Sequence, residues 1–240
     1  MNDIKYRQSV LKRARVIEEE LVTVAMKVAE LEQNTSGEIA VAITPESHDY
    51  SFWELLFAVL SGAVVFSCML MFANYITPWL ESLFWGEAPS WIVPFFYGVI
   101  IFFVIAFLFL AANMPWLDRI VIPLKNRRYA VHLRAVRHFA DSGVYATKEH
   151  SGILIFVSLL EREVQIIADS GICSKIDQSQ WNQIATDLAQ GFSAKEKGSS
   201  GKALLTAVSK CGDLLSTYFP PEKENPNELR DAVVILRAGE

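Results

Sequence analysis

The sequence lacks charge over two long stretches. Residues 55–76 and 91–112 contain no Asp, Glu, Lys or Arg. As helices that rise about 1.5 Å per residue, both are long enough to cross a hydrocarbon core about 30 Å thick. The sequence therefore predicts a membrane protein with a transmembrane helical hairpin over residues 52–114. Neither stretch places an ionisable group at mid-membrane, so we expect an anchor rather than a pore or a transport site.

Cysteine is also scarce. The chain has three cysteines in 240 residues, at Cys68, Cys173 and Cys211. An odd count without CxxC spacing argues against a disulfide framework and against a zinc site. The formal net charge of -5 gives no electrostatic reason to expect nucleic acid as a partner.

The familiar catalytic and nucleotide-binding motifs are absent as well. The sequence contains no P-loop, dinucleotide fingerprint, GxSxG or HExxH. Its first 30 residues are charged and helical in pattern, without the apolar core and the cleavage site of a signal peptide. Whether the protein is an enzyme stays open, and the missing motifs favour a non-enzymatic role.

Charge on either side of the two apolar stretches predicts their orientation. The connector of residues 77–90 contains Glu81 and Glu87 but neither Lys nor Arg, whereas the chain after the second stretch is basic. Positive charge is retained on the cytoplasmic side, so we expect both termini in the cytoplasm, at a bacterial plasma (inner) membrane. The basic residues then lie at anionic lipid headgroups, which is a plainer interpretation than nucleic-acid binding. The residues expected to contact headgroups are Arg119, Lys125, Arg127, Arg128 and Arg134.

The chain outside the hairpin has the pattern of a folded α/β domain. Apolar residues at spacings of three and four from Val10 to Leu31 predict a helix, which either packs on the protein's own sheet or forms a coiled-coil seam. Short runs rich in β-branched residues predict three strands and a final edge strand, and the second and third strands form a hairpin. The four strands are expected at residues 38–44, 152–159, 163–168 and 232–236.

Further helices follow from the same spacing. We expect them at residues 126–141, 177–192 and 202–219. In the first of these, Val136 is expected to face inward and Arg134 outward. A strand, a crossover helix and another strand favour a parallel pair. The predicted fold class is α/β, a small mixed sheet flanked by helices, built as a single discontinuous cytoplasmic domain from residues 1–51 and 115–240.

Three segments carry a family resemblance. In residues 29–43 a helix ends in Thr-Ser-Gly-Glu-Ile at the entry to a strand, and residues 150–159 and 163–172 form the paired central strands. Together they resemble the TPM domain family. The resemblance implies an α/β domain with helices on both faces of a small sheet. Known members include plant thylakoid proteins linked to photosystem repair, one with reported acid phosphatase activity, and bacterial membrane proteins, some of them encoded near LemA-type proteins.

The resemblance also bears on partners and cofactors. It implies another TPM-domain or LemA-type membrane protein as partner and a divalent cation as cofactor. Many members have Asp-Asn-Gly before the first central strand and Glu-Thr-Gly-Tyr-Gly after the second. Here those places hold His-Ser-Gly at residues 150–152 and Asp-Ser-Gly at residues 169–171. The acidic residue that precedes the first central strand in the family is missing here. Its absence argues against a phosphatase or calcium site of the family type, so no cofactor is expected.

Polar side chains at strand ends are the best catalytic candidates. Glu38, His150 and Asp169 each lie at the end of an expected strand, where crevices form in open α/β sheets. A His beside an Asp can perform acid–base chemistry near neutral pH. The alternative is that Glu38 and Asp169 are solvated strand-end residues and that His150 belongs to a turn.

Two functions are consistent with these features. The first is a membrane-anchored cytoplasmic interaction module in an envelope-associated protein complex, favoured by the apolar hairpin and the missing catalytic motifs. The second is a weak acid-phosphatase-like hydrolase acting on phosphorylated small molecules or proteins. The second would use Glu38, His150 and Asp169.

Overall fold

The structure is a computed structural model in two compact units. One unit comprises Met1–His48 and Lys125–Glu240, and the other comprises Asp49–Leu124. The predicted domain limits at residues 51 and 115 stay a prediction. The connector residue Glu87, which the orientation argument used, lies outside the described residues. The residues that the structure describes are 3–85, 89–112, 119, 121–147, 149–194, 196, 198–221, 229 and 232–239.

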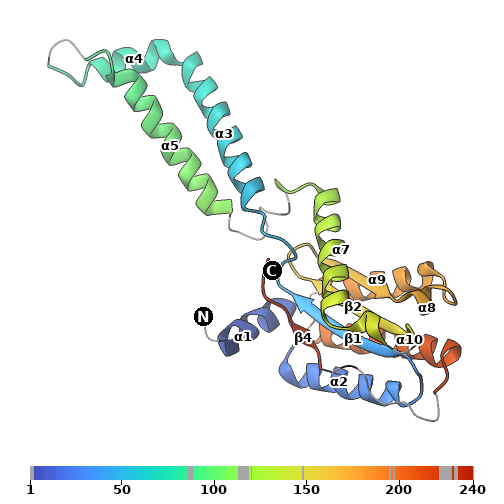
Figure 1. Ribbon diagram of the computed structural model, residues 1–240. Helices are drawn as coiled ribbons and strands as arrows, with labels where there is room; N and C mark the ends of the chain where they lie inside the picture. Colours follow the sequence, from blue (N-terminus) through green and yellow to red (C-terminus); the bar gives the residue numbers. More distant parts are fainter. Residues whose placement is uncertain are drawn as a thin grey trace. The chain divides into compact units, whose positions relative to one another are not determined.

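The first unit contains a mixed four-stranded sheet in the order β3-β2-β1-β4 (Figure 1). Strands β1 and β2 are parallel, with Glu38 opposite Gly152 and Thr44 opposite Ser158. Strand β3 runs antiparallel to β2, and β4 runs parallel to β1. The predicted α/β fold is therefore confirmed. The strands are β1 (Glu38–Thr44), β2 (Gly152–Ser158), β3 (Glu163–Ala168) and β4 (Val234–Ile235).

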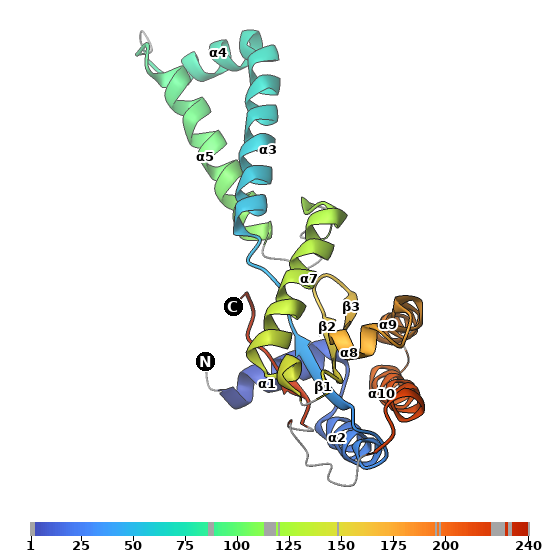
Figure 2. The same ribbon diagram turned by 45° about the vertical axis from the view of Figure 1, so that its right-hand side comes forward.

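Helices cover both faces of this sheet (Figure 2). On one face, Ile39 and Ile155 belong to the main core, together with apolar residues of the helices that precede β1 and of those that follow β3. On the other face, Leu154 and Phe156 pack with Val131 of α7. Strand β2 is buried along its whole length, as expected for a central strand with apolar residues on both faces. The helices are α1 (Asp3–Ala14), α2 (Glu18–Glu32), α7 (Leu124–Asp141), α8 (Ser170–Cys173), α9 (Gln178–Ser193) and α10 (Ser199–Tyr218).

The N-terminal helix is broken where the sequence predicts one continuous helix. Arg15 has a positive φ of 57°, and the Val16 amide donates to the Leu11 carbonyl, which closes α1. The Glu20 carboxylate then accepts the Ile17 amide at 3.0 Å and starts α2. Ile17 is consequently exposed, whereas Val24 and its apolar neighbours pack in the core of the unit. The stripe therefore packs on the protein's own sheet.

Helix α7 is rotated relative to the orientation expected from sequence. Val131 and Ala135 are buried as predicted, but Arg134 is also buried and Val136 is 41% exposed. The Arg134 guanidinium donates to the Arg237 carbonyl at 3.4 Å, while its long aliphatic stem can lie along apolar surface. The prediction that Arg134 faces outward and Val136 inward is wrong.

The second unit is an antiparallel helical hairpin. Its long helices are α3 (Ser51–Met71) and α5 (Ile92–Ala112), and the shorter α4 (Ala73–Glu81) follows α3. Within the described residues, α3 and α5 are the two helices long and apolar enough to cross a membrane. The first stretch was expected to run unbroken to Ile76, but α3 ends at Met71 and α4 begins at Ala73.

Contacts between α3 and α5 hold this hairpin together. A Cβ added at Gly62 would lie 2.8 Å from Ile105 Cγ1, so the missing side chain lets the helices approach closely. The Tyr97 ring packs edge-on against Phe66. Elsewhere both helices expose large apolar side chains, among them Leu60 of α3 and Phe107 of α5.

Candidate functional site

The three candidate residues lie at one end of the sheet in the first unit. Glu38 opens β1, and its amide donates to the Ser151 carbonyl at 3.2 Å. His150 precedes β2 by two residues, and Asp169 follows β3 directly. The Asp169 amide donates to the Gly152 carbonyl at 3.0 Å, which continues the β2–β3 pairing to this point.

His150 and Asp169 contact each other. His150 Nδ1 lies 3.3 Å from Asp169 Oδ2. The other carboxylate oxygen, Oδ1, accepts the Ser170 amide at 2.6 Å and caps the short helix α8. The His150 side chain is 61% exposed, so its second nitrogen is accessible to solvent. The pair can orient an imidazole at the surface, and Asp169 also has a structural role.

Glu38 is separated from this pair. Asp169, Gly152 and Glu38 follow one another across β3, β2 and β1, so two strand spacings, about 10 Å, separate the outer backbones. Between them Gly152 has no side chain, and the backbone of Val144 fills that place. A Cβ on Gly152 would lie 2.2 Å from the Val144 carbonyl oxygen. Glu38 itself is buried. The structure therefore brings together two of the three candidates.

The loop around His150 is closely packed on α8. His150 has a positive φ of 52°. A Cβ on Gly171 would lie 2.6 Å from the carbonyl oxygens of both Glu149 and His150, so only glycine allows this approach. Within the described residues, no group of three or more His, Cys, Asp or Glu side chains could hold a metal ion.

The basic residues expected at lipid headgroups differ in their surroundings. Arg128 Nε bonds to Glu163 Oε1 at 2.8 Å, and Arg134 is buried in the first unit. Arg127 is half-buried. Lys125, at the start of α7, is exposed. Arg119 belongs to the second unit and is half-buried. Lys125 and Arg128 are thus the two exposed residues of the five, and Arg128 is ion-paired.

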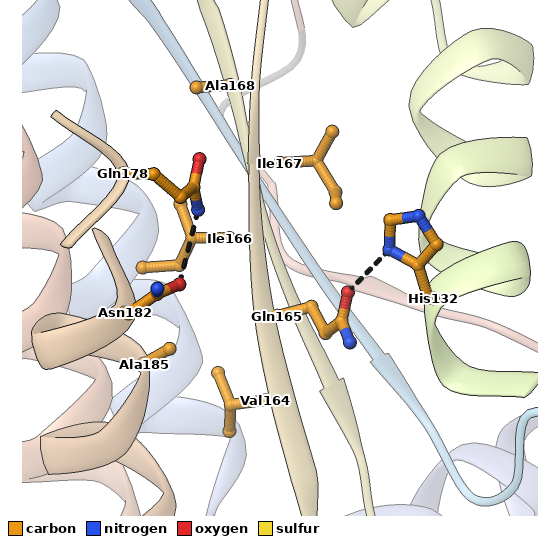
Figure 3. A pocket seen from close by; sticks show the side chains of 9 residues that line it. All are labelled: His132, Val164, Gln165, Ile166, Ile167, Ala168, Gln178, Asn182 and Ala185. Carbon is orange, nitrogen blue, oxygen red and sulfur yellow. Dashed lines mark hydrogen bonds between the residues drawn. The ribbon is translucent and has the colours of Figure 1, made fainter. Parts of the chain in front are cut away.

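A groove follows the outer edge of β3, a feature that the sequence did not reveal (Figure 3). It is a cavity of about 300 Å³, here called the β3 groove. The strand forms its floor, with His132 of α7 on one side and Gln178, Asn182 and Ala185 of α9 on the other. Among the described residues that line it, none is Asp, Glu, Lys or Arg. The groove is therefore polar without formal acidic or basic charge.

The walls of the β3 groove present amide groups. Gln165 Oε1 lies 3.0 Å from His132 Nδ1, and Gln178 Nε2 donates to Asn182 Oδ1 at 3.2 Å. These bonds leave the amide nitrogens of Gln165 and Asn182 as possible donors to a ligand. The sequence signal is a glutamine within the apolar strand β3. The helix residues that meet it lie 33 positions before it, at His132, and 13 to 20 positions after it, at Gln178 to Ala185, so they cannot be matched to it by spacing alone.

Comparisons with known proteins support the family resemblance. The TPM domain family matches residues 119–214. The NMR structure of BA42 protein from the psychrophilic bacterium Bizionia argentinensis is similar, with a TM-score of 0.51 and 17% sequence identity. The similarity covers 92% of this chain and 94% of that chain. At this identity it shows a shared fold alone. No curated protein matches the sequence.

Proposed function

We propose that this chain, which carries a TPM domain, is a membrane-anchored interaction module. In this proposal α3 and α5 span a plasma (inner) membrane of bacterial type, with both termini in the cytoplasm. The first unit then binds a protein partner at the membrane surface, as part of an envelope-associated complex. The TPM resemblance makes a second TPM-domain protein or a LemA-type membrane protein the first partner to look for.

The observation that carries this proposal is the exposed apolar surface of α3 and α5. Phe102, Phe103 and Phe107 of α5 are each at least 64% exposed. Isolated apolar residues at a surface need no explanation, but contiguous apolar helices do. A lipid hydrocarbon core provides the missing apolar surroundings, and both helices have the required length.

Basic residues that follow α5 in the sequence fit an anionic membrane surface. Lys125 is exposed, and each such charge contributes about 1 kcal/mol of attraction close to anionic lipid. Arg119, Arg127 and Arg128 are proposed to add to this attraction. Arg134 is buried and bonded to a backbone carbonyl, so its proposed contribution is an indirect electrostatic one.

Two experiments test the anchor and the partner separately. A reporter that is active only outside the cytoplasm, fused to the carboxyl terminus, should give no activity. Strong activity would overturn the proposed orientation. Purification of the full chain in mild detergent should return a protein partner in stoichiometric amount, and its repeated absence would count against the interaction module.

The contact between His150 and Asp169 supports a second candidate function. An imidazole held by a carboxylate can act as a general acid or base in phosphate ester hydrolysis. Phosphate release from p-nitrophenyl phosphate by the purified chain would be compared with that of His150→Ala and Asp169→Ala. His132→Ala is the matched control, because His132 lies on α7, whereas His150 lies in the loop before β2. Unchanged release in the first two variants would eliminate the pair as a catalytic site.

A further inference from the structure

We propose that the β3 groove binds an extended peptide segment, which adds to the sheet as a further strand. The segment has an uncharged centre of five residues and a basic residue at either end. The inference rests on the proposed function in one respect, namely that the segment belongs to the protein partner. Strand addition at an open sheet edge is a general mode of peptide recognition.

The backbone of β3 has hydrogen-bonding groups directed into the groove. Strand β3 is at the edge of the sheet. Because the Asp169 amide bonds to Gly152, every second residue from Asp169 backwards bonds to β2. The residues in between, Val164, Ile166 and Ala168, direct their amide and carbonyl groups to the outer edge. The Ala168 carbonyl receives a weak bond from the Cys173 thiol at 3.4 Å. Among the described residues no other bond to these outward groups is found, so they can pair with an incoming strand.

The walls select the composition of the incoming strand. Its side chains would alternate between the α7 wall and the α9 wall, as in any strand. Hydroxyl or amide side chains suit the Gln165 side, where an amide nitrogen is available. Small apolar side chains suit the side of Val164 and Ala185. No lining residue would compensate a charged side chain at the centre of the segment.

Charge at the ends of β3 distinguishes a peptide from a second copy of this chain. Self-pairing about Ile166 would place Val164 opposite Ala168, and therefore Glu163 opposite Asp169 of the other copy. Carboxylates directly opposite each other are destabilising. Glu163 already pairs with Arg128 at 2.8 Å, and Asp169 contacts His150 at 3.3 Å. A peptide with a basic residue at each end adds a further cation beside each carboxylate and brings no second carboxylate to either one. The charge pattern thus favours a peptide with basic ends.

The probe is the heptapeptide acetyl-Lys-Val-Thr-Val-Thr-Val-Lys-amide, labelled with fluorescein. Its binding to the full chain in detergent micelles would be followed by fluorescence anisotropy. We expect saturable binding with a dissociation constant below about 1 mM. A second peptide, methylated on the backbone nitrogens of all three valines, should bind at least tenfold more weakly, because the nitrogens that face β3 cannot donate. Glutamate in place of both lysines should also weaken binding.

A pair of variants at one position tests the groove itself. Val164→Pro removes an outward amide, and proline is tolerated at an edge strand when its missing N–H faces outward. It should weaken peptide binding about tenfold, whereas Val164→Ala keeps the amide and should change binding less than twofold. Should Val164→Pro fail to fold, Ala168→Pro removes another outward amide, and the methylated peptide needs no variant.

Three results would overturn the inference. They are the absence of saturable binding by the lysine-ended peptide, equal binding by the methylated peptide, and full binding by correctly folded Val164→Pro. A partner that copurifies with Val164→Pro as well as with the native chain would also overturn it. That last result would leave the proposed function intact, because the partner would then use another surface.

Discussion

Strand β2 and helix α5 are both apolar runs, but their surroundings are opposite. Every residue of β2 is buried, with neighbouring strands on both edges and helices on both faces. In α5, Phe102 and Phe107 are 67% and 70% exposed. The same kinds of side chain are therefore covered by protein in one unit and uncovered in the other. The difference shows that an apolar run does not by itself specify that protein will cover it, and that its length and its neighbours in the fold decide this.

The largest expected effect concerns phenylalanine truncation in the two units. Phe156→Ala should lower the free energy of unfolding of the first unit by about 3–5 kcal/mol, because Phe156 is fully buried beside Val131 and Ala135. Phe102→Ala is the matched control and should leave that energy unchanged. Protease cleavage of the first unit against urea concentration, in detergent, measures both. Equal losses would remove the distinction between the two environments.

A charge on α5 tests what covers its exposed side chains. Phe102→Arg should disfavour membrane insertion by about 2.5–3.5 kcal/mol, because a charged residue would then lie at the bilayer centre. At a water-exposed surface the same change would cost little. The fraction of protein that resists carbonate extraction from membranes measures insertion. Tyr129→Arg, an exposed position of α7 in the first unit, should leave the extracted fraction unchanged.

The contact between α3 and α5 predicts an intermediate effect. Gly62→Leu should destabilise the hairpin by about 1–3 kcal/mol, because its Cβ would lie 2.8 Å from Ile105 and the helices must separate. Gly98→Leu is the control, since nothing lies within 4 Å of a Cβ there. Thermal unfolding in detergent measures the stability of the two variants. The formation of a disulfide cross-link between the two helices is a second measure of how closely they pack. Equal behaviour would mean that the helices do not pack as the structure shows.

The smallest expected effect is a pH dependence in the first unit. Burial lowers the pKa of His138, the positive charge of Arg134 lowers it further, and Asp141 partly raises it. The unfolded chain therefore takes up this proton more readily, so stability should fall as the pH drops below about 6.5. His138→Asn should flatten that part of the profile of unfolding free energy against pH. A native slope retained in the variant would assign it to other groups.

The strands of the first unit could be predicted from sequence. The expected and observed limits agree at residues 38–44 and 163–168, because short β-branched runs end at turn-forming residues. The turn between β2 and β3 also agrees, with Arg162 at a positive φ of 54°. The parallel pairing followed from the long connection between β1 and β2. Local composition thus contained enough information for the sheet.

The helix errors have long-range causes. The break at Arg15 interrupts an apolar spacing that continues on both sides of it, so periodicity could not detect it. The rotation of α7 depends on Arg134, which donates to a carbonyl of Arg237 far along the chain. An arginine with an apolar stem and a distant acceptor can be buried, although its residue type predicts exposure.

The candidate site could be predicted only in part. His150 and Asp169 were both expected at strand ends, and the hairpin register brings them into contact. Glu38 lies in the same cross-strand row, but Val144 fills the space above Gly152 and keeps it apart. The β3 groove depends on two helices that the sequence places on opposite sides of β3. Such convergence depends on tertiary packing rather than on residue spacing.

Cysteine labelling in intact cells tests the membrane anchor most directly. In a background with Cys68 and Cys173 replaced by alanine, buried Cys211 should stay unreactive, since burial raises the pKa of its thiol to about 12. Ser82→Cys, after α4, and Ser193→Cys, at the end of α9, then report on the connector and on the first unit. A membrane-impermeant maleimide should label Ser82→Cys in intact cells and Ser193→Cys only after permeabilisation. Labelling of Ser193→Cys in intact cells, or no labelling of Ser82→Cys, would contradict a spanning hairpin with the first unit in the cytoplasm.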